Sequence, residues 1–145
     1  MSPLLQNPKR ILAIDYGSRR LGVAISDPMN IIAQGLPTLV NDQRVFEQLR
    51  VIIRDHPIGC IVVGMPYNLK GESGMKAKEV EEFIERLRTE VEVPVTTWDE
   101  RFTSKLAQDA MREMGTKKMK RRRKGAVDQM ASVLLLQSYL DRRKD

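Results

Sequence analysis

Short apolar runs bounded by polar turns predict that the first forty residues form β-strands. Two of these runs, 10–15 and 22–26, are separated only by the turn YGSRRL. Parallel strands need a crossover of about a dozen residues, so this short connection predicts an antiparallel hairpin. A third strand is expected within 31–40.

Beyond residue 40, the apolar spacing becomes helical in two segments, each followed by a strand. The first helix ends before Pro57, and the second is MKAKEVEEFIERLRTEV; the strands are CIVVGMP and VPVTTWDE. A third helix is expected over about 104–114, with Thr103 as its N-cap and Gly115 as its stop, and AVDQMASVLLLQSYLDRR closes the chain as a helix. The predicted buried stripes are Val45, Phe46, Leu49, Ile52 and Ile53 in the first helix and Val80, Phe83, Ile84 and Leu87 in the second.

The resulting order, β-β-β-α-β-α-β-α-α, predicts an α/β fold with a mixed sheet and helices on both faces. We expect one domain over 1–145, with residues 1–8 as a loose arm and 115–125 as a mobile basic segment.

Composition narrows the class of protein. Hydrophobic residues make up 41% and charged residues 30%, which is typical of a globular protein, and no apolar run approaches the roughly 20 residues of a membrane helix. The N-terminus has no secretion signal, and the single cysteine, Cys60, fits a reducing cytoplasm. One cysteine and one histidine cannot supply a zinc centre. We therefore expect a cytoplasmic protein with no membrane partner.

The positive charge of the chain is concentrated in one segment, KKMKRRRK at 117–124. Without its seven cations, the formal net charge of +6 becomes −1. Such a local run favours contact with a polyanion, in particular nucleic acid, although a solvated basic run is the alternative. The candidate nucleic-acid contacts in this run are Lys117, Lys118, Lys120, Arg121, Arg122, Arg123 and Lys124.

Carboxylates stand at the positions where α/β sheets form ligand sites. Asp15 ends the first strand, Asp99 and Glu100 end the last strand, and Asp128 lies near the start of the closing helix. Acids that meet there repel one another unless a cation joins them, and oxygen ligands favour one or two Mg²⁺ or Mn²⁺ ions. Structural roles stay open: an acid of the last strand pairing with Arg101, Asp128 complementing the helix dipole, or Asp15 accepting from turn amides.

Four motifs, DYGSRRLGVAISD, VVGMPYNLKGESG, WDERFTS and VDQMASVLLLQSYL, resemble the YqgF family, also called RuvX, from about Lys9 to Asp141. The resemblance implies an RNase H-like fold, three-layer α/β/α, with a five-stranded mixed sheet in which strand 2 is antiparallel to the rest. It also implies similarity to RuvC-type Holliday-junction resolvases and a nuclease that processes the 5′ end of pre-16S rRNA.

The resemblance implies a catalytic and metal-binding triad of Asp15, the acid of WDER, and Asp128. RuvC-type enzymes carry an acid on the fourth strand, whereas here that strand ends VVGMP without a carboxylate. Adjacent residues on a strand face opposite sides, so only one of Asp99 and Glu100 can join the cluster. We favour Glu100 for its longer reach, with Asp99 as the fallback.

Further roles follow from this hypothesis. Asp15 would bridge the metals, Glu100 would hold one and Asp128 would complete the second site. Gly17 would permit a tight turn beside them. Trp98 is expected in the core; the alternative is a platform for base stacking. The candidate contacts to the substrate backbone are Arg20, Arg101, Asn68 and Lys70, the last two in a loop with Gly71 and Gly74; the alternative for Arg20 is an exposed turn residue.

We therefore predict a metal-dependent endonuclease that acts on structured nucleic acid, with pre-16S rRNA as substrate and the ribosome as partner. The alternatives are a Holliday-junction resolvase acting on branched DNA and a non-catalytic RNA-binding ribosome-assembly factor. An actin-like ATPase shares the D-x-G hairpin but needs two such lobes, and 145 residues supply one. The choice between monomer and homodimer stays open.

Overall fold

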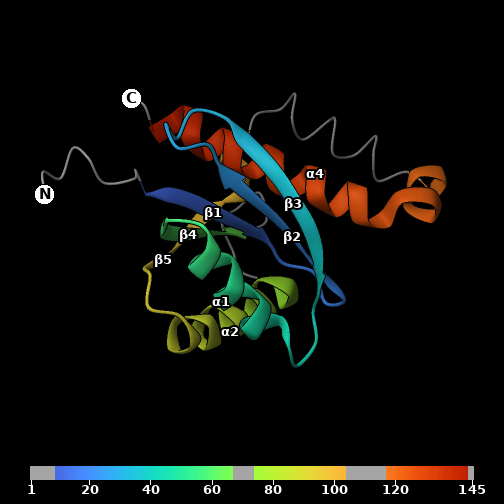
Figure 1. Cartoon of the computed structure of the whole chain (residues 1–145). Helices are drawn as coiled ribbons and strands as arrows, with labels where there is room; N and C mark the ends of the chain where they lie inside the picture. Colours follow the sequence, from blue (N-terminus) through green and yellow to red (C-terminus); the bar gives the residue numbers. More distant parts are fainter. Residues whose placement is uncertain (1–8, 67–73, 104–116, 144–145) are drawn as a thin grey trace, which may run out of the picture.

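The computed structural model describes residues 9–66, 74–103 and 117–143, and of 117–128 it describes the helical backbone only (Figure 1). The predictions that fall on 1–8, on the loop with Asn68, Lys70 and Gly71, and on a third helix at about 104–114 lie outside the described residues. No helix in the described ranges is long and apolar enough to cross a membrane.

One five-stranded sheet forms the centre of the fold. Its strands are β1 (Arg10–Asp15), β2 (Arg20–Ser26), β3 (Ala33–Val40), β4 (Ile58–Met65) and β5 (Val95–Asp99), in the order β3-β2-β1-β4-β5. β2 pairs antiparallel with β1 and β3, while β1, β4 and β5 pair in parallel. The predicted mixed sheet, with strand 2 antiparallel to the rest, is confirmed.

Helices cover both faces of the sheet, as predicted. α1 (Val45–Asp55) and α2 (Met75–Glu90) lie on one face, and the long helix α4 (Lys117–Arg143) crosses the other face (Figure 1). A short 3₁₀ turn, η2 (Glu100–Phe102), follows β5. The three-layer α/β/α architecture is confirmed.

The core has two halves because side chains alternate along each strand. Leu12 and Ile14 of β1 face α1 and α2, whereas Ile11 and Ala13 face α4. Both faces of β1 are therefore buried, which explains its uninterrupted apolar run. The stripe predicted for the second helix is buried throughout, and the stripe of the first helix is buried or partly buried in the same half.

Small residues on the α4 face of the sheet let this helix approach closely. Ala13, Ala24 and Ala33 are buried there, and a Cβ atom on Gly35 would lie 2.5 Å from Cγ of Gln129. Side-chain amides of α4 also bind the edge strand. Gln129 Nε2 donates to the Leu36 carbonyl at 2.7 Å. These contacts hold the helix across β2 and β3.

The boundaries of the basic run, β2 and β5 differ from the predictions. β5 ends at Asp99, and Glu100 begins the 3₁₀ turn η2 and does not end the last strand. α4 begins at Lys117, so the basic run at 117–124 forms its first turns and is not a separate segment in front of it. Lysine, arginine and methionine are strong helix formers, and the closing helix extends through them. β2 begins at Arg20, two residues before the predicted start, because the turn after β1 is tighter than the quoted connection suggests.

Candidate functional site

Asp15 is the last residue of β1 and lies at the rim of the sheet. It is paired across the antiparallel ladder with Gly22 and is half-buried. Ile11 and Ala13 belong to the core half beneath α4, so alternation places Asp15 on the α4 face as well. The sheet thus presents a carboxylate on the face covered by α4.

The turn after Asp15 is tight at Gly17. A Cβ atom at this position would lie 2.5 Å from the carbonyl oxygen of Arg20, so no side chain fits. Asn41 Nδ2 donates to the Gly17 carbonyl at 2.8 Å and holds the turn in place. This agrees with the tight turn predicted for Gly17.

Glu100 reaches over the end of the neighbouring parallel strand. A Cβ atom on Gly64 of β4 would lie 2.9 Å from Glu100 Oε1 and 3.4 Å from Glu100 Cγ, and it would collide with Leu135 Cδ1 of α4. The Glu100 side chain therefore occupies the space that a side chain on β4 would fill, beneath α4. Strand β4 pairs with β1, so Asp15 and Glu100 lie on the same face of adjacent strand ends.

Burial affects the charge of Glu100. Desolvation raises the pKa of this carboxyl group above its ordinary value, and nearby Asp99 adds to the rise, while Lys76 opposes it. A carboxylate in such surroundings is costly to ionise without a cation beside it. The raised pKa means that the neutral form of Glu100 is favoured more than in water.

Asp99 has a different environment, although it is adjacent in sequence. Its carboxylate accepts from the backbone N–H of Arg101 at 2.9 Å, which caps η2, and from Arg101 Nε at 3.0 Å. These bonds to Arg101 hold the pKa of Asp99 below its ordinary value. The structure thus separates the two acids, with Asp99 bound to Arg101 and Glu100 over Gly64.

The remaining predicted site residues are described in part. Position 128 is on α4, one turn before Ser132 and two turns before Leu135, but the Asp128 side chain lies outside the described residues. The basic residues at 117–124 are described only by their helical backbone. Arg20 begins β2 and is half-buried, and Gly74 precedes α2 in open space.

In the described part of the chain, no three His, Cys, Asp or Glu side chains gather as a metal site. The described donors at the rim are Asp15 and Glu100. Both supply hard oxygen ligands, and the glycine beneath Glu100 leaves space for its carboxylate. This donor set fits Mg²⁺ or Mn²⁺.

Gly64 has a role that the sequence interpretation missed. The absence of a carboxylate there was evident, but not the room that the glycine makes for Glu100. The signal was available, since a glycine interrupts an otherwise bulky strand and often marks close approach of another group.

Three residues that line a pocket with Trp98 were not predicted either: Phe102, Tyr139 and Arg142. Trp98 itself is buried, as predicted.

The sequence and the fold of this chain are similar to those of known proteins. A model of the RuvX family, described as Holliday junction resolvase, matches residues 9–142. A protein of Sulfurihydrogenibium sp. (strain YO3AOP1) named "Putative pre-16S rRNA nuclease" is 41% identical over 135 residues, covering 92% of this chain and 90% of that protein. A protein of the same name from Koribacter versatilis (strain Ellin345) is 45% identical over 138 residues, covering 92% and 88%.

A solved structure titled T. thermophilus RuvC in complex with Holliday junction substrate has a similar fold. Its TM-score is 0.57 at 13% identity, over 94% of this chain and 96% of that chain. At this identity the likeness concerns the arrangement of strands and helices, and it supports the RNase H-like fold class.

Proposed function

Because this chain belongs to the RuvX family, as its four motifs predicted, we propose that it is an endonuclease that hydrolyses phosphodiester bonds in structured RNA. The proposed substrate is precursor 16S rRNA, with the 5′ end as the processed end and the ribosome as partner. The names of the two relatives support the substrate class, and the resolvase-like fold supports the chemistry.

The observation that carries this proposal is the position of Glu100 over Gly64. In RuvC-type enzymes an acid is expected on the fourth strand, and here the acid that directly follows β5, Glu100, lies over the end of that strand. Asp15 lies on the same face, one strand away. Because Glu100 places a carboxylate over the end of β4, it would take the role of an acid on β4 itself.

Asp15, Glu100 and Asp128 would hold one or two Mg²⁺ or Mn²⁺ ions. When bound, such ions activate water and stabilise the leaving oxygen of a phosphodiester. The described side chains would hold the ions and contact the substrate. Asp15 would present its oxygen ligands from the end of β1, and Glu100 from the turn η2 that follows β5. Arg101, which is paired with Asp99 and is 35% exposed, would contact a substrate phosphate from within this ion pair.

Affinity for the substrate would come from phosphate contacts around the cut. Residues 117–124 would bind backbone phosphates without reading sequence, and Arg20, Asn68 and Lys70 would contact the strand nearer to the rim. Such contacts position the nucleic acid and make binding dependent on salt.

Two alternatives have support of their own. The description of the RuvX family favours a resolvase that cuts branched DNA, which would act as a dimer. The lack of a carboxylate at Gly64 and Met65 favours a ribosome-assembly factor that binds RNA without cutting it. These alternatives predict different outcomes in one experiment.

The test is incubation of the purified protein with precursor 16S rRNA and with a four-way DNA junction, each with Mn²⁺ and with a chelator. We expect cleavage of the RNA only with Mn²⁺. Cleavage confined to the junction would favour the resolvase, and tight binding without cleavage would favour the assembly factor.

The matched variants are Asp15→Asn and Asp27→Asn. Asp27 is an acid at the opposite end of the hairpin, where its carboxylate accepts from the amides of Ile31 and Ile32 at 2.7 and 2.8 Å. We expect the first variant to fold without activity and the second to retain activity. Full activity of Asp15→Asn would overturn the proposed site.

A further inference from the structure

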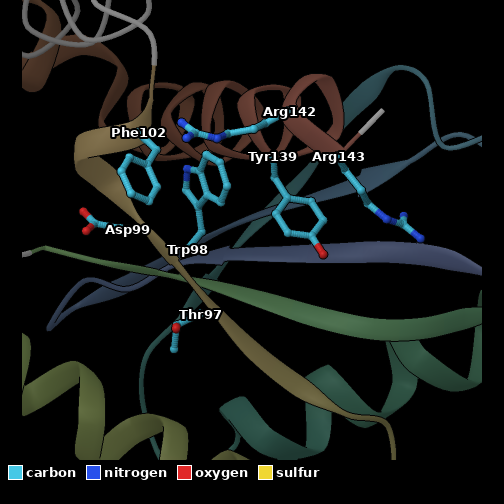
Figure 2. A pocket seen from close by; sticks show the side chains of 7 residues that line it. All are labelled: Thr97, Trp98, Asp99, Phe102, Tyr139, Arg142 and Arg143. Carbon is cyan, nitrogen blue, oxygen red and sulfur yellow. The ribbon is translucent and has the colours of Figure 1, made fainter. Parts of the chain in front are cut away.

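A pocket of about 430 Å³ lies between β5 and the C-terminal end of α4, beside the candidate site (Figure 2). Its walls are the rings of Trp98, Phe102 and Tyr139, and Arg142 and Arg143 lie along its α4 side. Ligand pockets occupy roughly 300–1,000 Å³, so this pocket has the size for a small aromatic group. Thr97 and the carboxylate of Asp99, which is bound to Arg101, complete the lining. Aromatic walls with two cations are suited to a flat ring that carries a phosphate.

Trp98 contacts the other two rings edge to face, and Phe102 is partly exposed to solvent. Trp98 meets Phe102 edge to face, with ring centroids 5.7 Å apart, and meets Tyr139 in the same way at 5.6 Å. Phe102 is 49% exposed, whereas Trp98 beside it is buried. The guanidinium of Arg142 covers the Phe102 ring at 4.4 Å from its centroid. A cationic group therefore already lies over this ring.

The indole N–H of Trp98 adds a polar feature. Trp98 is 9% exposed, and its Nε1 is buried with no acceptor among the described residues. In Figure 2 this nitrogen lies on the side of the indole nearer to Phe102, whose ring is at best a weak acceptor. A buried donor without an acceptor destabilises a protein. A ligand acceptor that reaches this nitrogen would remove that cost.

The pocket is next to the rim that carries Glu100. In the sheet, Trp98 is paired with Gly64, the residue over which Glu100 lies. On α4, Leu135 would touch a Cβ atom on Gly64, and Tyr139 is one turn further along, a rise of about 6 Å. A strand cut at the rim would thus bring a nearby nucleotide to the pocket.

We propose that this pocket binds an unpaired nucleobase of the RNA strand, next to the phosphate that is cut. The proposal rests on the nuclease function proposed above and adds how the substrate is held. The base stacks on Phe102 in place of the Arg142 guanidinium, and one of its carbonyl or ring-nitrogen acceptors receives the Trp98 N–H. Arg142 and Arg143 then pair with the adjacent phosphates, so the pocket selects a single strand over a duplex.

The chain offers a direct probe, because Trp98 is its only tryptophan. The experiment follows Trp98 fluorescence while single-stranded oligouridylate, an RNA duplex of equal length, or an abasic strand is added in the presence of a chelator. We expect quenching by the single strand, and at most a weak response to the duplex and the abasic strand. Equal responses to all three would overturn the proposal.

Variants of Phe102 test the stack. Stacking of one base on an aromatic residue corresponds to roughly 5- to 150-fold in affinity, so Phe102→Leu is expected to bind the single strand that much more weakly. Phe102→Tyr keeps the ring and is expected to bind as the wild type does. The matched control is Phe46→Leu, which removes a ring covered by Arg86 at 5.1 Å on the opposite face of the sheet. Unchanged binding in Phe102→Leu would contradict the proposal.

Two further measurements keep the outcomes distinct. If Phe102→Leu fails to fold, as judged by circular dichroism, quenching of the wild type by uridine monophosphate but not by ribose 5-phosphate still decides the point. Because the chelator prevents metal-dependent cleavage, a normal quenching pattern without cleavage in Mn²⁺ would remove the proposed function and leave the base pocket in place. Cleavage with no base-dependent quenching would remove the base pocket and leave the proposed function in place.

Discussion

Replacing Gly64 by alanine tests whether the space over β4 matters for activity. The new Cβ atom would lie 2.9 Å from Glu100 Oε1 and would collide with Leu135 Cδ1. Carbon atoms in good contact are about 3.5–4.0 Å apart, so Leu135 must retreat by about 1 Å and the Glu100 carboxylate by about half that distance. Gly64→Ala therefore displaces a proposed metal ligand while adding only one methyl group.

Two effects of different size are expected. Overpacking a well-filled core costs about 1–3 kcal/mol, and for a chain of this size each kcal/mol lowers the Tm by roughly 2–4 °C. Displacement of a catalytic group by 1 Å can cost about 10²-fold in rate, so half that displacement of Glu100 should cost about tenfold. Gly64→Ala should thus remain folded at 25 °C and lose about tenfold in Mn²⁺-dependent cleavage.

Gly35→Ala is the matched control. Its Cβ atom would lie 2.5 Å from Cγ and 2.6 Å from Cδ of Gln129, so it also presses on α4, but over β3 and away from Glu100. Both variants should show similar losses in thermal unfolding monitored by circular dichroism, and only Gly64→Ala should lose cleavage beyond that shared effect.

Cleavage of RNA by Gly64→Ala at the wild-type rate, with a Tm that falls as in Gly35→Ala, would contradict this expectation. That result would mean that the Glu100 carboxylate can move without effect. A double variant with Leu135→Val separates the two contacts, because valine lacks the δ-methyl group. It should recover part of the stability and none of the activity.

Three further predictions concern the acids and the basic run. Glu100→Gln should abolish metal-dependent cleavage, whereas Asp99→Asn should retain most of it, and the opposite order would make Asp99 the ligand. Asp99 also links stability to pH: its pKa is lowered in the folded state by Arg101, so its contribution is present above the ordinary pKa of aspartate and is lost as the pH falls through the lowered value. The difference in Tm between wild type and Asp99→Asn should therefore shrink at low pH. Replacing the cations of 117–124 by serine should weaken RNA binding and flatten its dependence on salt, by about 0.7 in the slope for each phosphate that is no longer neutralised; an unchanged slope would assign the run to solvation.

Most of the fold could be predicted because the signals are local. The turn YGSRRL is too short for anything but an antiparallel pair, and the stripe from Val80 to Leu87 fits one helical face. The start of α4 could not be predicted in this way. A run of lysines and arginines is compatible both with a helix and with a solvated segment, and the apolar period begins only after it.

The candidate site was harder to predict, because it depends on how neighbouring elements pack. Strand alternation explains why Asp99 and Glu100 differ, but it does not say which acid turns toward α4. That choice depends on Arg101, which binds Asp99, and on Gly64, which leaves space for Glu100. The aromatic pocket was missed because its residues come from β5, η2 and the end of α4, and their proximity exists only in three dimensions.

Leu135 and Glu100 lie together over Gly64. Leu135 belongs to α4, which follows all five strands in the chain. During synthesis, the sheet can therefore assemble while the rim beneath α4 is still uncovered. The proposed site is therefore complete only after α4 has docked on the sheet, because Leu135 and position 128 both belong to that helix.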